Sequence, residues 1–112
     1  NISSQASLVA IKDHAIYCAS KGGVNLLTKV LALEWAEKGI TVNAISPTFT
    51  YTPGTAERLN DPEYLANVLN KIPVGKVATI GDIPAAILYL IGSNSSMVTG
   101  SNLVIDGGWT IQ

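Results

Sequence analysis

The chain has 112 residues, 47% of them hydrophobic and 13% charged, which is enough apolar material for the core of one small domain. The formal net charge is -1 and the seven Lys and Arg residues are scattered, so the sequence offers no basic surface for nucleic acid. No stretch approaches the roughly 20 apolar residues of a membrane span, and the single cysteine, Cys18, has no internal disulfide partner; a cytoplasmic protein without nucleic-acid or membrane partners is predicted.

Residues 1–4 have the pattern of a strand end, and residues 7–16 read as a loop. Ser4 is followed thirteen residues later by Tyr17, and Tyr17 by Lys21 at the i+4 position. In a helix Tyr17 and Lys21 share one face. A lysine cation about 5 Å from a phenol favours the phenolate by about 3 kcal/mol at an effective dielectric of about 20. Such a tyrosine can exchange a proton near neutral pH, although the Tyr-x-x-x-Lys pair alone also occurs on ordinary surface helices.

The only histidine, His14, lies three residues before Tyr17. It either lines a substrate pocket or is an exposed loop residue, and we favour the loop. Without a second histidine or a cysteine cluster to complete a coordination sphere, the sequence predicts no metal site.

From Ala15 to Lys38 apolar residues recur at steps of three and four, which predicts a long helix buried on more than one side. Gly22 and Gly23 each cost a helix about 1 kcal/mol, so they indicate close approach of a partner helix or a cofactor ribose. Gly39 predicts the helix end. Residues 40–46 then predict a buried strand that ends at Pro47, which indicates an αβ unit of a parallel sheet.

Residues 48–55 are rich in Thr, Pro and Gly, which predicts an irregular loop at the carboxyl end of a parallel strand, where open α/β sheets bind ligands. Residues 56–71 predict one or two short helices, either a mobile lid or an ordinary cover of the sheet edge. Thr79 and Asp82 predict a helix start, with Pro84 in the first turn of a helix over 80–91. That helix is expected to bury four residues, Ile83, Ile87, Leu88 and Leu90.

After a polar break over 92–96, Asn102–Ile105 is predicted as a short last strand. A glycine turn with Trp109 follows, and this tryptophan either anchors a subunit contact or folds back on its own core.

In order along the chain, these segments resemble the short-chain dehydrogenase/reductase family. The segments that carry the resemblance are Asn1-Ile2-Ser3-Ser4, Tyr17-Cys18-Ala19-Ser20-Lys21-Gly22-Gly23, Gly39-Ile40-Thr41-Val42-Asn43-Ala44-Ile45-Ser46-Pro47, Thr52, Thr99-Gly100 and Val104-Ile105-Asp106-Gly107-Gly108. The resemblance covers essentially the whole chain, and the ordered set is specific where each piece is not.

The resemblance implies an α/β fold, the C-terminal half of a Rossmann-like doubly wound parallel sheet. It implies hydride transfer between NAD or NADP and a secondary alcohol or ketone, with Ser4, Tyr17 and Lys21 as catalytic residues. Ser3 competes with Ser4 but lacks the family's interval to the tyrosine. The implied cofactor contacts are Tyr17, Lys21, Pro47, Thr48, Thr50 and Thr52. The implied substrate contacts are Ser4, His14, Tyr17 and Phe49.

The family usually has glycine where this chain has Thr48, which leaves the fine geometry of the cofactor site open. Helices 15–38 and 80–91 resemble the family's dimer surfaces, so a homo-oligomer, a dimer or tetramer, is expected. The Asp-Gly-Gly-Trp-Thr ending and the composition of residues 56–71 are similar to relatives that act on sugars, polyols or small cyclic ketones. A 3-oxoacyl thioester reductase is the alternative substrate class.

No G-x-G-x-x-G turn, nor the family's T-G-x-x-x-G-x-G variant, occurs in the sequence. Residues 1–112 are therefore predicted to be a single partial domain without the dinucleotide phosphate-binding half. The rival hypothesis is a non-catalytic folding or assembly fragment of such an enzyme. A dinucleotide-sensing regulator is disfavoured because Ser4, Tyr17 and Lys21 are all retained.

Overall fold

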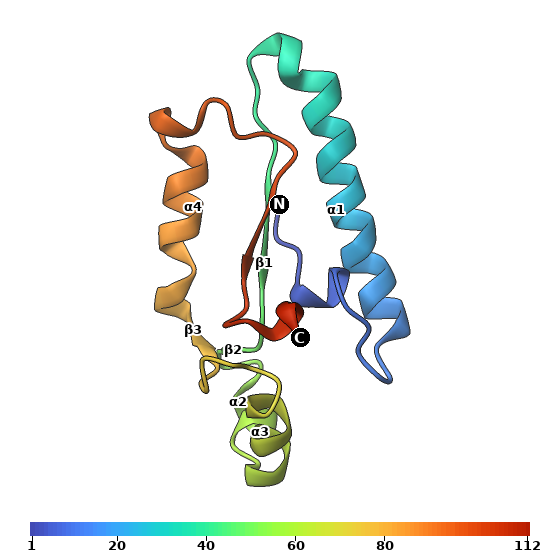
Figure 1. Cartoon of the computed structure of the whole chain (residues 1–112), viewed down its shortest axis with the longest axis vertical. Coiled ribbons are helices and arrows are strands. Elements are labelled where there is room, and N and C mark those ends of the chain that lie inside the picture. The colour runs from blue at the N-terminus through green and yellow to red at the C-terminus, as the bar shows by residue number, and fades with distance from the viewer.

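The computed structural model describes residues 1–112 and has an α/β architecture (Figure 1). Two parallel strands, β1 (Ala44–Pro47) and β4 (Asn102–Ile105), lie at the centre. Helix α1 (Ala15–Trp35) covers one side of them and α4 (Pro84–Ile91) the other. Helices on both sides of parallel strands are the arrangement of a doubly wound sheet, so the predicted fold class is confirmed. None of the helices combines the length and apolarity needed to cross a membrane.

The segment before α1 runs beside β1 without becoming a full strand. Ile2 forms a parallel bridge to Ile45, and the Ser3 N–H donates to the Ile45 carbonyl at 2.8 Å. Ser4 is then the N-cap of a 3₁₀ turn, η1 (Gln5–Ser7), because its hydroxyl accepts from the Ala6 N–H. The sequence pattern did not predict this turn, which fixes Ser4 at the carboxyl end of the extended segment.

Helix α1 ends as predicted, since its last turn passes into a 3₁₀ turn, η2 (Ala36–Lys38), and Gly39 closes it in the left-handed conformation at φ 72°. The expectation that the helix is buried on more than one side is wrong for this chain. Only Thr28 and Ala32 are buried, whereas a row of large apolar side chains faces outward. The helix packs on η1 and β1 with one side only.

Strand β1 begins at Ala44, later than the predicted Ile40. The residues before it bond to a turn rather than to a neighbouring strand. The Val42 N–H donates to the Thr99 hydroxyl at 3.0 Å, and the Asn43 side chain both donates to the Val98 carbonyl and accepts from the Ser101 N–H. These side-chain bonds accompany a backbone bond from the Gly100 N–H to the Val42 carbonyl at 2.8 Å, and β-branched composition could not reveal the arrangement.

The loop after β1 is more regular than predicted, because β2 (Thr50–Tyr51) pairs in parallel with β3 (Ala78–Thr79). Between these strands lie α2 (Ala56–Leu59) and α3 (Pro62–Leu69), the two short helices expected there. They project beyond the central strands at one end of the molecule (Figure 1). We call residues 56–71 the cap.

Trp109 folds back on its own chain, which answers the question left open by the sequence. It is buried with Val68 and Ile72 of the cap region, and Phe49 packs against it with ring centroids 5.4 Å apart. The C-terminal turn, η5 (Trp109–Ile111), is thus attached to the cap.

The residues predicted to start the fourth helix do form a helix cap, but the α-helix itself begins later than predicted. Thr79 and Asp82 form a capping box around a 3₁₀ turn, η3 (Ile80–Asp82), and α4 starts with Pro84 as its first residue. Hydrogen bonds from the backbone and hydroxyl of Thr79 hold the pKa of the Asp82 carboxyl below its usual range. Leu88 is 65% exposed, and Ile83, Ile87 and Leu90 are only partly buried, so the predicted burial of these four residues is wrong for this chain.

Asp106 organises the turn between β4 and η5. Its carboxylate accepts from the Gly108 N–H at 2.9 Å, the Thr110 N–H at 2.8 Å and the Thr110 hydroxyl at 2.7 Å. Burial by itself raises the pKa of this carboxyl, but these hydrogen bonds outweigh it, and the pKa lies below its usual value.

We expect Asp106→Asn to lower the free energy of unfolding of the full-length protein by about 2 kcal/mol at pH 7, because hydrogen bonds to a charged acceptor are lost. Because the pKa of Asp106 is lowered in the folded state, its ionised carboxylate stabilises the folded protein above the unfolded-state pKa of about 3.9. This contribution to stability disappears as the pH falls through the folded-state pKa. The difference between wild type and variant, measured by urea unfolding, should therefore shrink towards pH 3. Glu34→Gln is the control for losing one carboxylate, and a pH-independent difference for Asp106→Asn would contradict the assignment.

Candidate active site

Two hydrogen bonds join Lys21 to the extended segment that ends in Ser4. The Lys21 ammonium donates to the Ile2 carbonyl at 3.1 Å, and the Ser3 hydroxyl donates to the Lys21 carbonyl at 3.1 Å. The extended segment that ends in Ser4 is therefore held against the first turns of α1. The ammonium also lies 5.8 Å from the centroid of the Tyr17 ring, as the i, i+4 spacing predicts.

Tyr17 is 45% exposed, so its phenol remains open to a reactant. Ser4, by contrast, is buried, and its hydroxyl has a defined orientation: it accepts from the Ala6 N–H at 3.2 Å and donates to the Gln5 side-chain oxygen at 2.8 Å. The Ser3 hydroxyl is occupied by the helix backbone. Both serine hydroxyls therefore have partners, Ser3 on the helix backbone and Ser4 on a side chain, and the choice of Ser4 stays a prediction from the sequence interval to Tyr17.

His14 lies beside Tyr17 rather than away from it. The two rings meet edge to face with centroids 6.5 Å apart, and His14 Nδ1 is 2.8 Å from the Lys12 carbonyl oxygen. The ring is partly buried at the start of α1. Both readings from the sequence, a pocket wall and an exposed loop residue, therefore stay predictions.

The predicted cofactor contacts occupy the carboxyl end of β1 and the loop after it. Thr48 is buried, and its hydroxyl oxygen has no hydrogen-bond partner. The other two threonines are engaged within the loop: the Thr50 hydroxyl donates to the Thr48 carbonyl, and the Thr52 hydroxyl lies 3.1 Å from that of Thr55. Pro47 is the last residue of β1. Phe49 contacts the cap, where it packs edge to face on Tyr64 with ring centroids 6.2 Å apart.

Two residues that sequence reasoning did not select hold the Ser4 segment. Asn25 on α1 donates to the Ser7 hydroxyl at 2.6 Å, and that hydroxyl donates to the Ser4 carbonyl. Gln5 is buried and bonds the Ser4 hydroxyl itself. A long polar side chain directly after a predicted strand-end serine was the available signal for Gln5.

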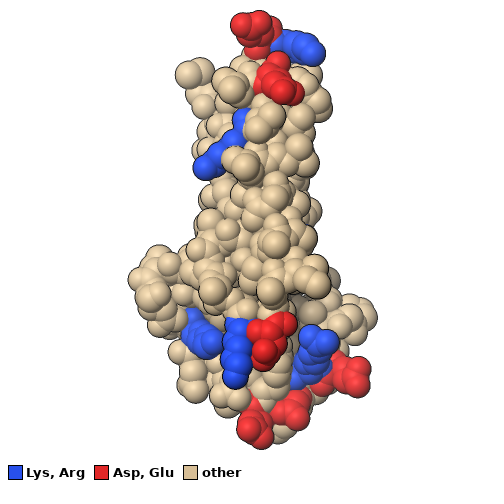
Figure 2. Space-filling model, turned by 90° about the vertical axis from the view of Figure 1, so that its right-hand side faces the viewer, with Lys and Arg blue, Asp and Glu red and all other residues tan.

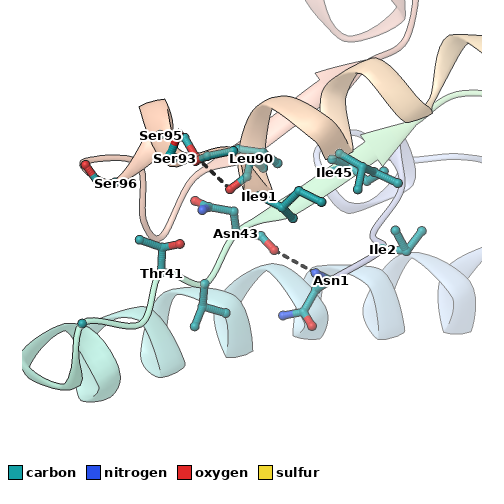
Figure 3. A pocket seen from close by; sticks show the side chains of 14 residues that line it. Asn1, Ile2, Thr41, Asn43, Ile45, Leu90, Ile91, Ser93, Ser95 and Ser96 are labelled. Carbon is teal, nitrogen blue, oxygen red and sulfur yellow. Dashed lines mark hydrogen bonds between the residues drawn. The ribbon is translucent and has the colours of Figure 1, made fainter.

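A cavity of about 460 Å³ lies elsewhere (Figure 3). It opens between α4 and the strand side formed by Ile2 and Ile45, and none of Ser4, Tyr17 or Lys21 lines it. The Ser95 hydroxyl closes one end by donating to the Leu90 carbonyl at 3.0 Å. We also find no group of three or more His, Cys, Asp and Glu side chains placed to hold a metal ion.

A family model described as enoyl-(acyl carrier protein) reductase, of the adh_short_C2 type, matches residues 1–110. D-erythrulose reductase of Gallus gallus is 41% identical over 99% of this chain and 45% of its own length. 3beta-hydroxysteroid dehydrogenase 1 of Eggerthella lenta is 45% identical over 99% of this chain and 42% of its own length. Among solved structures, 4-hydroxyisoleucine dehydrogenase complexed with NADH superposes with a TM-score of 0.96 at 37% identity, over 100% of this chain and 46% of that one. The chain therefore spans less than half the length of these relatives.

Proposed function

The chain belongs to the short-chain dehydrogenase/reductase family, and on this premise we propose that the protein transfers a hydride between NAD or NADP and a secondary alcohol or ketone. One observation carries the proposal: the Lys21 ammonium donates to the Ile2 carbonyl, two residues before Ser4, and lies 5.8 Å from the centroid of the Tyr17 ring, which supports a site that combines a hydroxyl, a phenol and an ammonium. These are the groups needed to bind a carbonyl oxygen and protonate it.

The residues present fit a nicotinamide cofactor. The Thr48 hydroxyl is buried at the end of β1 without a partner, as expected of a group awaiting a polar ligand. Tyr17, Lys21, Pro47, Thr48, Thr50 and Thr52 are the proposed contacts. No glycine-rich phosphate turn occurs within these 112 residues, so the pyrophosphate requires contacts from sequence outside them.

In the reduction direction the bound cofactor supplies the hydride. The Tyr17 Oη donates its proton to the carbonyl oxygen of the substrate, and the Ser4 hydroxyl donates a hydrogen bond to the same oxygen. The Lys21 ammonium stabilises the phenolate that remains. Phe49 and His14 are the proposed side walls for the substrate, one from the loop after β1 and one from the start of α1.

For the substrate we propose a sugar, a polyol or a small cyclic ketone. The similarity to D-erythrulose reductase supports this class. Two alternative substrate classes remain to be tested. The similarity to a steroid dehydrogenase favours a steroid, and the family model's description favours an acyl thioester.

A turnover panel with the full-length protein tests the class. Ketoses and polyols, a 3-hydroxysteroid and a 3-oxoacyl thioester are each assayed with NAD(H) and NADP(H), and kcat/KM is compared. We expect the highest value for a ketose or polyol. Preference for the steroid or the thioester would replace the substrate class, whereas no turnover of any compound and no binding of either cofactor would favour the non-catalytic assembly role.

We also propose that the protein is a homo-oligomer and works in the cytoplasm. The free Cys18 suits a reducing compartment.

Charged side chains gather at the two ends of the face that carries α1 and leave an uncharged band between them (Figure 2). Apolar side chains of α1 lie open, with Leu33 81% and Leu26 64% exposed, which is more apolar surface than a lone helix face normally leaves to water. Light scattering on the full-length protein measures the mass, and a monomer would refute this part.

A further inference from the structure

The hydroxyl of Ser4 has a single proton, and the structure shows it already committed. It donates to Gln5 Oε1 at 2.8 Å, while the Ala6 N–H fills one of the two acceptor positions of the Ser4 oxygen at 3.2 Å. A substrate oxygen that needs this proton must therefore compete with Gln5. This reasoning rests on the proposed function, in which Ser4 donates to the substrate.

Gln5 cannot simply be left behind when Ser4 turns to the substrate. It is only 4% exposed, and an acceptor that loses its donor in such a position carries a desolvation cost. The amide has a second end, however. Nε2 makes no hydrogen bond within the chain, and the Ser4 oxygen keeps one acceptor position open.

We propose that Gln5 is a positioning residue whose amide turns over during the reaction. At rest Oε1 accepts the Ser4 proton. When a substrate oxygen binds, the amide reverses, Nε2 donates to Ser4 Oγ, and the Ser4 proton points at the substrate. Each orientation makes one hydrogen bond to Ser4 and leaves the other end of the amide free, so the reversal costs little free energy. In the reversed state the Ser4 oxygen accepts from two N–H groups, those of Ala6 and Gln5, while its proton points at the substrate.

Replacing the amide with a carboxylate removes the second orientation. In Gln5→Glu the ionised side chain has no donor and is a stronger, charge-assisted acceptor, so it keeps the Ser4 proton. The protonated side chain regains an O–H and can turn as the amide does. Burial raises the pKa of a carboxyl at this position, which brings its titration into an accessible range.

The elements packed against η1 are α1 and β1, and the titratable groups there must be considered in a pH experiment. Strand β1 has none. On α1 and at its start they are His14, Tyr17, Cys18, Lys21, Lys29 and Glu34. Since wild type and variant share all of them, only a difference between their pH profiles reports on position 5.

The experiment measures kcat and KM of the full-length protein between about pH 5 and 9. Gln5→Glu should lose about tenfold in kcat at pH 8 and recover as the pH falls towards 5, with KM little changed. Gln5→Met, which has neither donor nor strong acceptor, should lose about tenfold in kcat at every pH. Asn94→Asp is the control, because it makes the same amide-to-carboxylate change at an exposed residue beyond the far end of α4 and should keep the wild-type profile.

Parallel pH profiles for wild type and Gln5→Glu, or a wild-type kcat for Gln5→Met, would overturn the inference. If Gln5→Glu does not fold, the separate effects of Gln5→Met on kcat and KM test the inference alone. Incomplete folding lowers the fraction of active protein, but it does not change kcat per titrated active site. Tyr17→Phe is measured beside these variants. An active Tyr17→Phe defeats the proposed function, whereas an inactive one with silent Gln5 variants defeats only the role of Gln5.

Discussion

Tyr17→Phe is expected to reduce kcat of the full-length protein about a thousandfold, the range in which a positioned general acid acts. The change deletes one oxygen atom and keeps the ring, so the edge contact with His14 and the position of Lys21 over the ring should persist. Cofactor affinity, measured by nicotinamide fluorescence, and the thermal midpoint should stay close to wild type. A loss confined to kcat would identify the phenol oxygen as a group that acts in the transition state.

Tyr89→Phe is the matched control for this variant. Tyr89 is 54% exposed and lies on α4, on the other side of the central strands from α1, which carries Lys21. We expect wild-type kcat from it. Turnover of Tyr17→Phe within tenfold of this control would be incompatible with Tyr17 as the proton donor.

Local chemistry made much of this fold predictable. The end of the helical segment at Gly39 and the strand Asn102–Ile105 match because a left-handed glycine and a short apolar run act over a few residues. The capping box of Thr79 and Asp82 is equally local. The i, i+4 relation of Tyr17 and Lys21 needs nothing beyond the helix itself.

The features that escaped prediction depend on contacts between distant segments. The late start of β1 arises because Asn43 bonds to the Val98 carbonyl, and the exposed face of α1 depends on what lies against it. The orientation of the Ser4 hydroxyl depends on how η1 packs on α1, which brings Asn25 to Ser7. Residue types and their spacing led us to propose Ser4 as the catalytic serine, but only the fold shows which group accepts the proton of its hydroxyl.

The junction between the cap and the C-terminal turn is a second place where a change of one atom should have a large effect, here on stability. Gly107 has a φ of 62°, and a Cβ there would lie 2.7 Å from Ile72 Cγ2 and 3.3 Å from Val74 Cβ. Gly107→Ala therefore combines a left-handed conformation, costing about 1–2 kcal/mol, with overpacking of similar size. We expect the free energy of unfolding to fall by about 3 kcal/mol, measured by urea unfolding of the full-length protein.

Gly75→Ala separates the two causes. Gly75 has a similar φ of 77° and its amide donates to the Ile72 carbonyl, but nothing lies within 4 Å of the added carbon. Only the conformational cost should appear, about 1 kcal/mol. Because the Val74 N–H donates to the Gly107 carbonyl at 3.0 Å, the larger effect at Gly107 should also loosen the cap and increase its cleavage by protease. Equal losses for the two variants would mean that Ile72 moves aside and that the contact does not hold the cap.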